Sequence, residues 1–206
     1  MGFYDRYILP PLLGAACAVR PISRQRDKIV PQVEGVVLEL GFGSGLNLSH
    51  YDAGKITRLY GLEPSEGMLV KARTAARDAR FPVEILQETA EALSLPAHSV
   101  DPGLGTYSLC TIPDAVSALA GARRALKPGG RLLFCEHGLA PDESVRAWQR
   151  RIEPIWRPIA GGCHLTRDIP ALIKAGGFEI ESLETMYLPK SPKWAGFNYW
   201  GAARPL

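Results

Sequence analysis

The sequence lacks the features that mark several classes of protein. None of its four cysteines, Cys17, Cys110, Cys135 and Cys163, stands in a CxxC pair. This spacing predicts reduced thiols in a cytoplasmic protein, with no disulfide framework and no metal site. The net charge of +3 is small and the acidic and basic residues are interleaved, so we expect no nucleic-acid partner.

Long apolar runs are also missing. Residues 8–19, ILPPLLGAACAV, form an apolar run of 12 residues, whereas a helix that spans a bilayer needs about 20. Residues 1–30 are therefore expected to form a helical cap over the site or the core, and weak contact with a membrane surface is the alternative. The basic cluster that follows, residues 20–28, is interrupted by Asp27 and is interpreted as a solvated helix face.

What the sequence does contain is an alternation of strand-like and helix-like segments. Its 206 residues, 46% hydrophobic and 22% charged, are enough for one α/β domain. Short apolar runs predict strands, and apolar residues at three- and four-residue spacing predict helices. The expected strands are residues 36–40, 59–62, 83–86, 100–109 and 131–136, and the expected helices are residues 46–51, 65–79 and 115–126. This order predicts a parallel sheet with helices on both faces.

The pattern changes after residue 140. We expect a helix over residues 144–159 that Pro154 and Pro158 interrupt, a helix over 169–175, and strands over 178–187 and 197–204. The last two strands are joined by a short loop and should pair antiparallel. The chain is thus expected to be a single domain over 1–206, with a cofactor-binding half at 31–140 and substrate-side helices and a terminal hairpin at 141–206.

One strand is poorly suited to its place. The fourth expected strand begins Asp101-Pro102-Gly103, although proline cannot donate a ladder hydrogen bond and glycine weakens a strand. We expect a bulge or a delayed start of the strand there.

A glycine-rich turn follows the first expected strand. Gly41, Gly43 and Gly45 follow the spacing G-x-G-x-G, not the G-x-G-x-x-G of dinucleotide-binding folds. Glu39 lies inside the strand, where a carboxylate would repel a pyrophosphate but suits an ammonium group. Glu63 ends the next strand and is placed to accept hydrogen bonds from ribose hydroxyls. S-adenosylmethionine carries an ammonium group and a ribose but no phosphate, so these residues predict that cofactor.

Three segments carry a resemblance to a known family. Residues 36–45, residues 61–65 with Met68 and Leu69, and residues 126–133 together resemble class I S-adenosylmethionine-dependent methyltransferases, in the type 11 subgroup that acts on small molecules. The resemblance implies a Rossmann-like fold with a seven-stranded, mostly parallel sheet of order 3-2-1-4-5-7-6 and an antiparallel last strand. Further cofactor contacts are expected at Asn47, Pro64, Met68, Thr89, Ala90, Glu91, Tyr107 and Leu109.

The C-terminal half resembles one branch of this family. Residues 136–138 and the tryptophan- and glycine-containing stretch 148–167 are similar to the methyltransferase-like proteins that methylate alkyl thiols. The resemblance implies a small, apolar acceptor of thiol, amine or phenol type, methylated by in-line displacement. His164 and His137 are the candidate catalytic residues. The alternatives are a phospholipid or quinone methyltransferase at a membrane surface and a non-catalytic protein that binds S-adenosylmethionine. The sequence does not indicate an oligomeric state.

Overall fold

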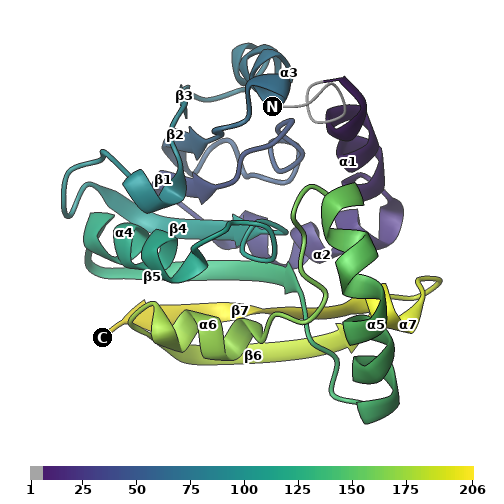
Figure 1. The fold of residues 1–206 in the computed structure, drawn as a ribbon. Coiled ribbons are helices and arrows are strands. Elements are labelled where there is room, and N and C mark those ends of the chain that lie inside the picture. Colours follow the sequence, from purple (N-terminus) through teal and green to yellow (C-terminus); the bar gives the residue numbers. More distant parts are fainter. Residues whose placement is uncertain (1–6) are drawn as a thin grey trace.

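A computed structural model describes residues 7–206 of the chain; the first six residues of the predicted cap lie outside the described part. Seven strands form one sheet in the order β3-β2-β1-β4-β5-β7-β6 (Figure 1). The strands are β1 (Gly35–Leu40), β2 (Ile56–Leu62), β3 (Val83–Leu86), β4 (Val100–Thr106), β5 (Leu126–His137), β6 (Phe178–Tyr187) and β7 (Phe197–Pro205). Strands β1 to β5 pair parallel, and β7 pairs antiparallel with both β5 and β6. The predicted strand order and terminal hairpin are confirmed.

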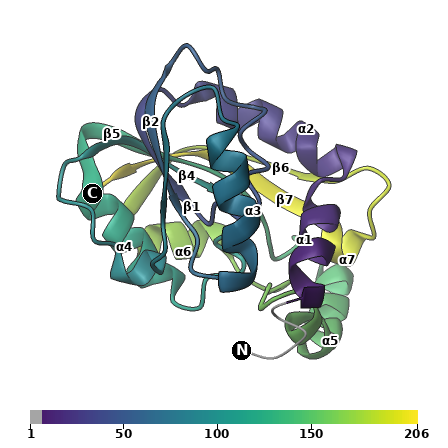
Figure 2. The same ribbon diagram turned by 90° about the horizontal axis from the view of Figure 1, so that it is seen from above.

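Helices cover both faces of this sheet, as expected for parallel strands that are apolar on both sides. Helices α4 (Ala115–Ala125) and α6 (Ile169–Ala175) pack with one set of buried side chains, which includes Leu38, Leu132 and Phe178. Helices α2 (Arg20–Ile29) and α3 (Glu66–Arg77) pack with the other set. Figure 2 shows α2 and the α4–α6 pair on opposite sides of the strands. Two cores thus hold the sheet, one on each face.

The irregular start of β4 is confirmed. The register between β4 and β5 shifts between Val100 and Pro102. The side chain of Asp101 accepts hydrogen bonds from the backbone N–H of Val36, at 2.7 Å, and from Lys127 Nζ, at 2.8 Å. The carboxylate therefore connects the irregular start of β4 to the starts of β1 and β5.

The helix predicted for residues 46–51 is wrong. The segment is a succession of turns, with N–H groups donating to the carbonyl three residues back, from Gly45 to Phe42, from Leu48 to Gly45 and from His50 to Asn47. The Asn47 side chain is bonded inside the site, as described below. These side-chain hydrogen bonds compete with a regular helix here.

Other predicted elements differ from the structure in detail: β2 begins three residues earlier than expected, and β4 ends at Thr106 instead of residue 109. Strand β5 begins at Leu126, which pairs with Val100, so residues 127–130 belong to the strand that was expected to begin at residue 131. Helix α5 (Glu143–Ile159) runs through Pro154 and Pro158 without interruption. The two prolines are four residues apart, so their missing N–H groups fall on the same side of the helix.

Shorter elements complete the chain. These are α1 (Leu9–Cys17), the 3-10 turns η2 (Val30–Gln32) and η3 (Ala90–Ala92), and α7 (Lys193–Gly196). Figure 1 shows α1 and α5 on the side of the sheet toward which the arrow of β5 points. Among residues 7–206, no helix has both the length and the apolar character needed to cross a membrane.

Candidate functional site

The glycine turn after β1 is shaped by left-handed backbone. Gly41, Gly43 and Gly45 have φ angles of +76°, +58° and +79°. Residues other than glycine rarely adopt these angles. A Cβ at Gly41 would lie 2.7 Å from the Cβ of Ser108, and one at Gly45 would lie 2.7 Å from the Cβ of Ala75. A Cβ at Gly43 would meet no heavy atom within 4 Å. Gly41 and Gly45 therefore permit close packing, whereas Gly43 borders open space that a ligand can use.

Glu63, at the end of β2, ties this turn to the neighbouring strand. Its Oε2 accepts a hydrogen bond from Gly43 N at 2.9 Å, and its Oε1 accepts one from Ser65 N at 2.8 Å. Burial raises the pKa of Glu63, and the two backbone hydrogen bonds oppose that rise. Each carboxylate oxygen keeps a second lone pair for a hydroxyl donor. Pro64 follows directly, and Met68 lies half-buried in the first turns of α3.

Glu39 lies in a buried network beneath the turn. Its Oε1 accepts a hydrogen bond from Asn47 Nδ2 at 2.8 Å, and its Oε2 accepts one from the hydroxyl of Tyr51 at 2.7 Å. Asn47 Nδ2 also donates to Thr106 Oγ1 at the end of β4. Burial raises the pKa of Glu39 to about 7, although both hydrogen bonds favour the charged form. Glu39 and Asn47 thus join β1, the glycine turn and β4.

Arg26 connects this network to the N-terminal helices. Its Nε donates to Asn47 Oδ1 at 2.9 Å, its Nη1 donates to the carbonyl of Cys17 at 2.7 Å, and its guanidinium lies 5.2 Å from the ring centroid of Tyr107. Arg26 is only 4% exposed, so the interpretation of residues 20–28 as a solvated face is wrong for this residue. A Cβ added at Gly14 would lie 3.8 Å from Ser44 Oγ. Helices α1 and α2 therefore pack against the glycine turn.

Three of the predicted cofactor contacts, Thr89, Ala90 and Glu91, form a short turn. Thr89 precedes η3, and Ala90 within it is buried. Glu91 Oε1 accepts a hydrogen bond from the backbone N–H of Asp114, at 3.2 Å. Glu91 thus connects η3 to the start of α4.

The loop after β4 is held by a buried carboxylate at the end of β5. Glu136 accepts hydrogen bonds from the backbone N–H groups of Ser108 and Leu109, both at 3.0 Å, and from Cys110 N at 3.3 Å. Burial raises the pKa of Glu136, and these hydrogen bonds oppose it. Tyr107, with φ of +55°, turns the chain into this loop. The side chain of Leu109 packs in the core, so only its backbone belongs to the site.

His164 lies on the segment between α5 and α6 and is bonded to a carboxylate. Its Nδ1 is 3.0 Å from Glu153 Oε1, and Glu153 Oε2 accepts a hydrogen bond from Thr166 N at 2.8 Å. Burial opposes the charge of Glu153, but the bonds from Thr166 and His164 outweigh it and lower the pKa. The backbone N–H of His164 donates to the carbonyl of Cys110 at 2.8 Å. This segment therefore closes over the end of β4.

The fold also brings together two cysteines and a histidine that are distant in the sequence. Cys163 Sγ lies 3.7 Å from Cys110 Sγ and 3.6 Å from His137 Nδ1. Hydrogen bonding to Cys110 and to His137 lowers the pKa of the Cys163 thiol, against the effect of burial. Burial lowers the pKa of His137, but the bond to Cys163 outweighs it, so the pKa is raised. All four cysteines are free.

Comparison with known proteins assigns the family. A family model described as a methyltransferase domain matches residues 38–134. Thiol S-methyltransferase TMT1B of Rattus norvegicus is 34% identical over 163 residues, which cover 78% of this chain and 66% of that protein. Thiol S-methyltransferase TMT1B of Homo sapiens is 30% identical over 187 residues, which cover 85% of this chain and 75% of that protein. The chain belongs to the S-adenosylmethionine-dependent methyltransferases.

Solved structures agree with this assignment at the level of the fold. An S-adenosylmethionine-dependent methyltransferase of Leishmania major superposes with a TM-score of 0.70 at 16% identity, and the match covers 98% of this chain and 80% of that one. The predicted family, fold and cofactor are thereby confirmed.

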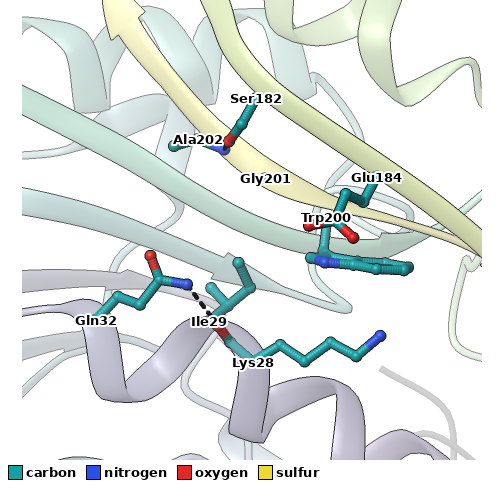
Figure 3. Close-up of a pocket in the computed structure, with 8 residues that line it drawn as sticks. All are labelled: Lys28, Ile29, Gln32, Ser182, Glu184, Trp200, Gly201 and Ala202. Atoms are coloured by element: carbon teal, nitrogen blue, oxygen red, sulfur yellow. Dashed lines mark hydrogen bonds between the residues drawn. The ribbon is translucent and has the colours of Figure 1, made fainter.

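One pocket of this methyltransferase lies away from the glycine turn. It has a volume of about 200 Å³ and lies between α2 and the β6–β7 hairpin. Figure 3 shows the side chain of Lys28 extended beneath the indole of Trp200, with its Nζ 3.5 Å from the ring centroid. None of the predicted site residues lines this pocket. It is therefore not the expected place of methyl transfer.

The candidate site of the methyltransferase is larger than the sequence predicted. The predicted residues Glu39, Asn47 and Glu63 lie around the glycine turn, and His137 and His164 lie near the end of β4. Sequence reasoning missed the residues that connect these parts of the site, which are Arg26, Cys110, Glu153 and Cys163. The cysteines are far apart in the sequence, whereas the fold makes two of them, Cys110 and Cys163, neighbours.

Proposed function

We propose that this methyltransferase transfers a methyl group to the sulfur of a small, apolar thiol. The observation that carries the proposal is the His164–Glu153 pair, 3.0 Å apart, on a segment whose backbone is bonded to the loop after β4. Alkyl thiols are mostly protonated at neutral pH and become strong nucleophiles only as thiolates. A histidine oriented by a carboxylate is a suitable proton acceptor for such a substrate. The names of the two TMT1B relatives support the same acceptor class.

The residues at the glycine turn fit S-adenosylmethionine. The space beside Gly43 is open, because a Cβ at this residue would have no heavy atom within 4 Å, and Glu63 keeps lone pairs for the ribose hydroxyls. Glu39 is a buried carboxylate, and the two hydrogen bonds described above come from neutral groups, those of Asn47 and Tyr51. It suits the ammonium group, directly or through Asn47. When bound, S-adenosylmethionine supplies an electrophilic methyl group on a sulfonium.

His164 and His137 then have different tasks. Glu153 holds Nδ1 of His164, which leaves Nε2 as the nitrogen that takes the proton of the acceptor thiol. Glu153 also stabilises the imidazolium that forms. His137 is bonded to Cys163 and is assigned to the wall of the acceptor site. Besides proton transfer to His164, much of the rate enhancement arises from alignment of the acceptor sulfur with the methyl group.

The apolar character of the acceptor is supported by the outer surface of α1 and α5. Ile8, Leu12, Trp148 and Ile155 are exposed large apolar side chains on these two helices or next to them. Exposed apolar patches are typical of contacts with lipids, apolar ligands or partners. This surface also supports weak contact with a membrane, through which apolar substrates would be captured. No comparison favours a phospholipid or quinone acceptor, or a protein without activity, over the thiol.

The proposal is tested by an acceptor screen with isotopically labelled S-adenosylmethionine. We expect labelled product with small alkyl thiols and little with amines, phenols or phospholipids. Transfer to one of those other classes without transfer to any thiol would refute the proposed acceptor.

A pair of histidine variants tests the mechanism. His164→Gln should lower kcat by about 100-fold or more, the usual contribution of a general base, with cofactor affinity unchanged by calorimetry. His50→Gln is the matched control, because His50 also bonds a carboxylate, Asp27 at 2.7 Å, but lies on the turn that faces α2. Equal rates for both variants would remove His164 from the mechanism.

A further inference from the structure

The mechanism above leaves the two cysteine sulfurs of the site unused. We propose that Cys110, Cys163 and His137 form a binding site for a thiophilic divalent metal ion of the zinc type, with one coordination position left for an external ligand. Their ligand atoms all lie within 4.8 Å of one another. Sequence spacing predicted no metal site, because the three residues come from different parts of the chain.

The distances match the edges of a tetrahedral site. Zinc binds cysteine sulfur at about 2.3 Å and histidine nitrogen at about 2.0–2.1 Å. For tetrahedral angles, these bond lengths place two sulfurs about 3.8 Å apart, and a sulfur and a nitrogen about 3.6 Å apart. The observed separations are 3.7 Å between the sulfurs of Cys110 and Cys163, and 3.6 Å between Cys163 Sγ and His137 Nδ1. The third edge, between Cys110 and His137, is within 4.8 Å.

The backbone that carries the three ligands is fixed on every side. Cys110 N donates to Glu136 Oε2 at 3.3 Å, and the carbonyl of Cys110 accepts from His164 N. Cys163 N donates to the carbonyl of Ala160 at 3.2 Å. His137 is the last residue of β5. A preorganised ligand set loses little conformational entropy when an ion binds.

The surroundings of the cluster favour a cation. Cys110 and His137 are 2% and 7% exposed, and the buried carboxylate of Glu136 lies beside them. His137 Nε2 is buried and has no hydrogen-bond partner among the described residues. Among the described residues, the His137 ring is therefore hydrogen-bonded only through Nδ1, to the sulfur of Cys163. The half-buried guanidinium of Arg167, which donates to the carbonyls of Leu109 and Ile112, offsets one of the negative charges of the cluster. Two thiolates beside the Glu136 carboxylate would need a further positive charge, which a divalent ion supplies.

A site with three protein ligands resembles catalytic zinc sites, which keep one position open, more than structural sites, which are closed. This step rests on the proposed function: the open position would take the acceptor sulfur. The S–H bond breaks, the proton leaves as described above, and the electron pair stays on sulfur. That sulfur then forms its bond to the methyl carbon as the bond between this carbon and the sulfonium breaks, which leaves S-adenosylhomocysteine.

The test uses the full chain, reduced and freed of metal by a chelator. Zinc affinity is measured by competition with a chromophoric chelator, and cobalt(II) serves as a spectroscopic probe. We expect one ion per chain and a charge-transfer band from thiolate to cobalt. Cys110→Ser and Cys163→Ser should each weaken zinc binding by at least about 100-fold, the upper range for loss of a supporting residue. Cys135→Ala is the matched control, because Cys135 is buried in β5 outside the cluster, and it should bind zinc as the wild type does.

The outcomes separate the metal site from the proposed function. Absence of the cobalt band, or equal zinc affinity in the wild type and both serine variants, would overturn the metal site. Addition of a thiol acceptor should change the spectrum of the bound cobalt. If the spectrum does not change and the metal-free protein shows full methyl transfer, the ion has no role in binding the acceptor. In that case thiol methylation itself would stand. Conversely, failure of every thiol in the acceptor screen would refute the proposed function but leave the zinc measurement valid.

Discussion

The buried carboxylate of Glu39 makes the stability of the protein depend on pH. Both of its oxygens accept hydrogen bonds from neutral groups, those of Asn47 and Tyr51, and burial raises its pKa from 4.5 to about 7. The folded protein therefore binds a proton more tightly than the unfolded chain. Between pH 4.5 and 7 the contribution of Glu39 to the free energy of unfolding therefore falls as the pH rises. The shift of about 2.5 pKa units corresponds to about 3.4 kcal/mol in total.

Glu39→Gln removes this titration and keeps the size of the side chain. Between about pH 5 and 8, we expect the free energy of unfolding of the wild type to fall by about 2.5 kcal/mol more than that of the variant. Urea denaturation of both proteins without cofactor, at several pH values, measures the difference. All other titrating groups are shared, so the comparison isolates Glu39. Parallel pH profiles would refute the inference that this carboxyl group is protonated in the folded protein near neutral pH.

Cofactor binding should reverse the effect. An ammonium group near Glu39 favours the carboxylate, so its pKa falls when S-adenosylmethionine binds. At about pH 7 the carboxyl group is about half protonated, and binding should release about 0.5 proton. Calorimetry in two buffers with different heats of ionisation measures this number. No proton release by the wild type, or equal release by Glu39→Gln, would show that the ammonium group does not approach this carboxylate.

Three further predictions concern the cofactor site and the surface. Glu63→Ala should weaken binding of S-adenosylmethionine by about 1–3 kcal/mol, measured by calorimetry, and Glu66→Ala, in the first turn of α3, should leave it unchanged; equal affinities would contradict the ribose role. Gly43→Ala should reduce cofactor affinity because its Cβ enters the space beside the turn, at a cost of about 1–2 kcal/mol in stability from the positive φ; unchanged affinity would mean that this space is not used. Co-sedimentation with lipid vesicles should decrease in the variants Leu12→Glu and Ile155→Glu, and equal sedimentation of wild type and variants would refute membrane contact through α1 and α5.

Much of the fold could be predicted because its signals are local. Strands β1 and β3 and helix α6 follow from short apolar runs and from the glycines and prolines that bound them. The predicted helix over residues 46–51 failed for a different reason. The apolar residues of this segment are spaced as in a helix. However, the Asn47 side chain donates hydrogen bonds to Glu39 and Thr106, and these tertiary contacts favour turns over a regular helix. Local pattern cannot reveal partners that lie on other strands.

The same distinction explains which parts of the site were found. Glu39, Glu63 and His137 stand at or next to strand ends, and in a parallel sheet these ends meet at one edge. Cys110 also follows a strand end, four residues after β4, so its position at this edge could have been foreseen. Cys163 could not, because it lies after α5, on a segment whose placement depends on the bond from His164 N to the carbonyl of Cys110. The spacing of cysteines in a sequence therefore excludes only local metal motifs. A site that combines the loop after β4, the end of β5 and the segment after α5 can be recognised only from the folded chain.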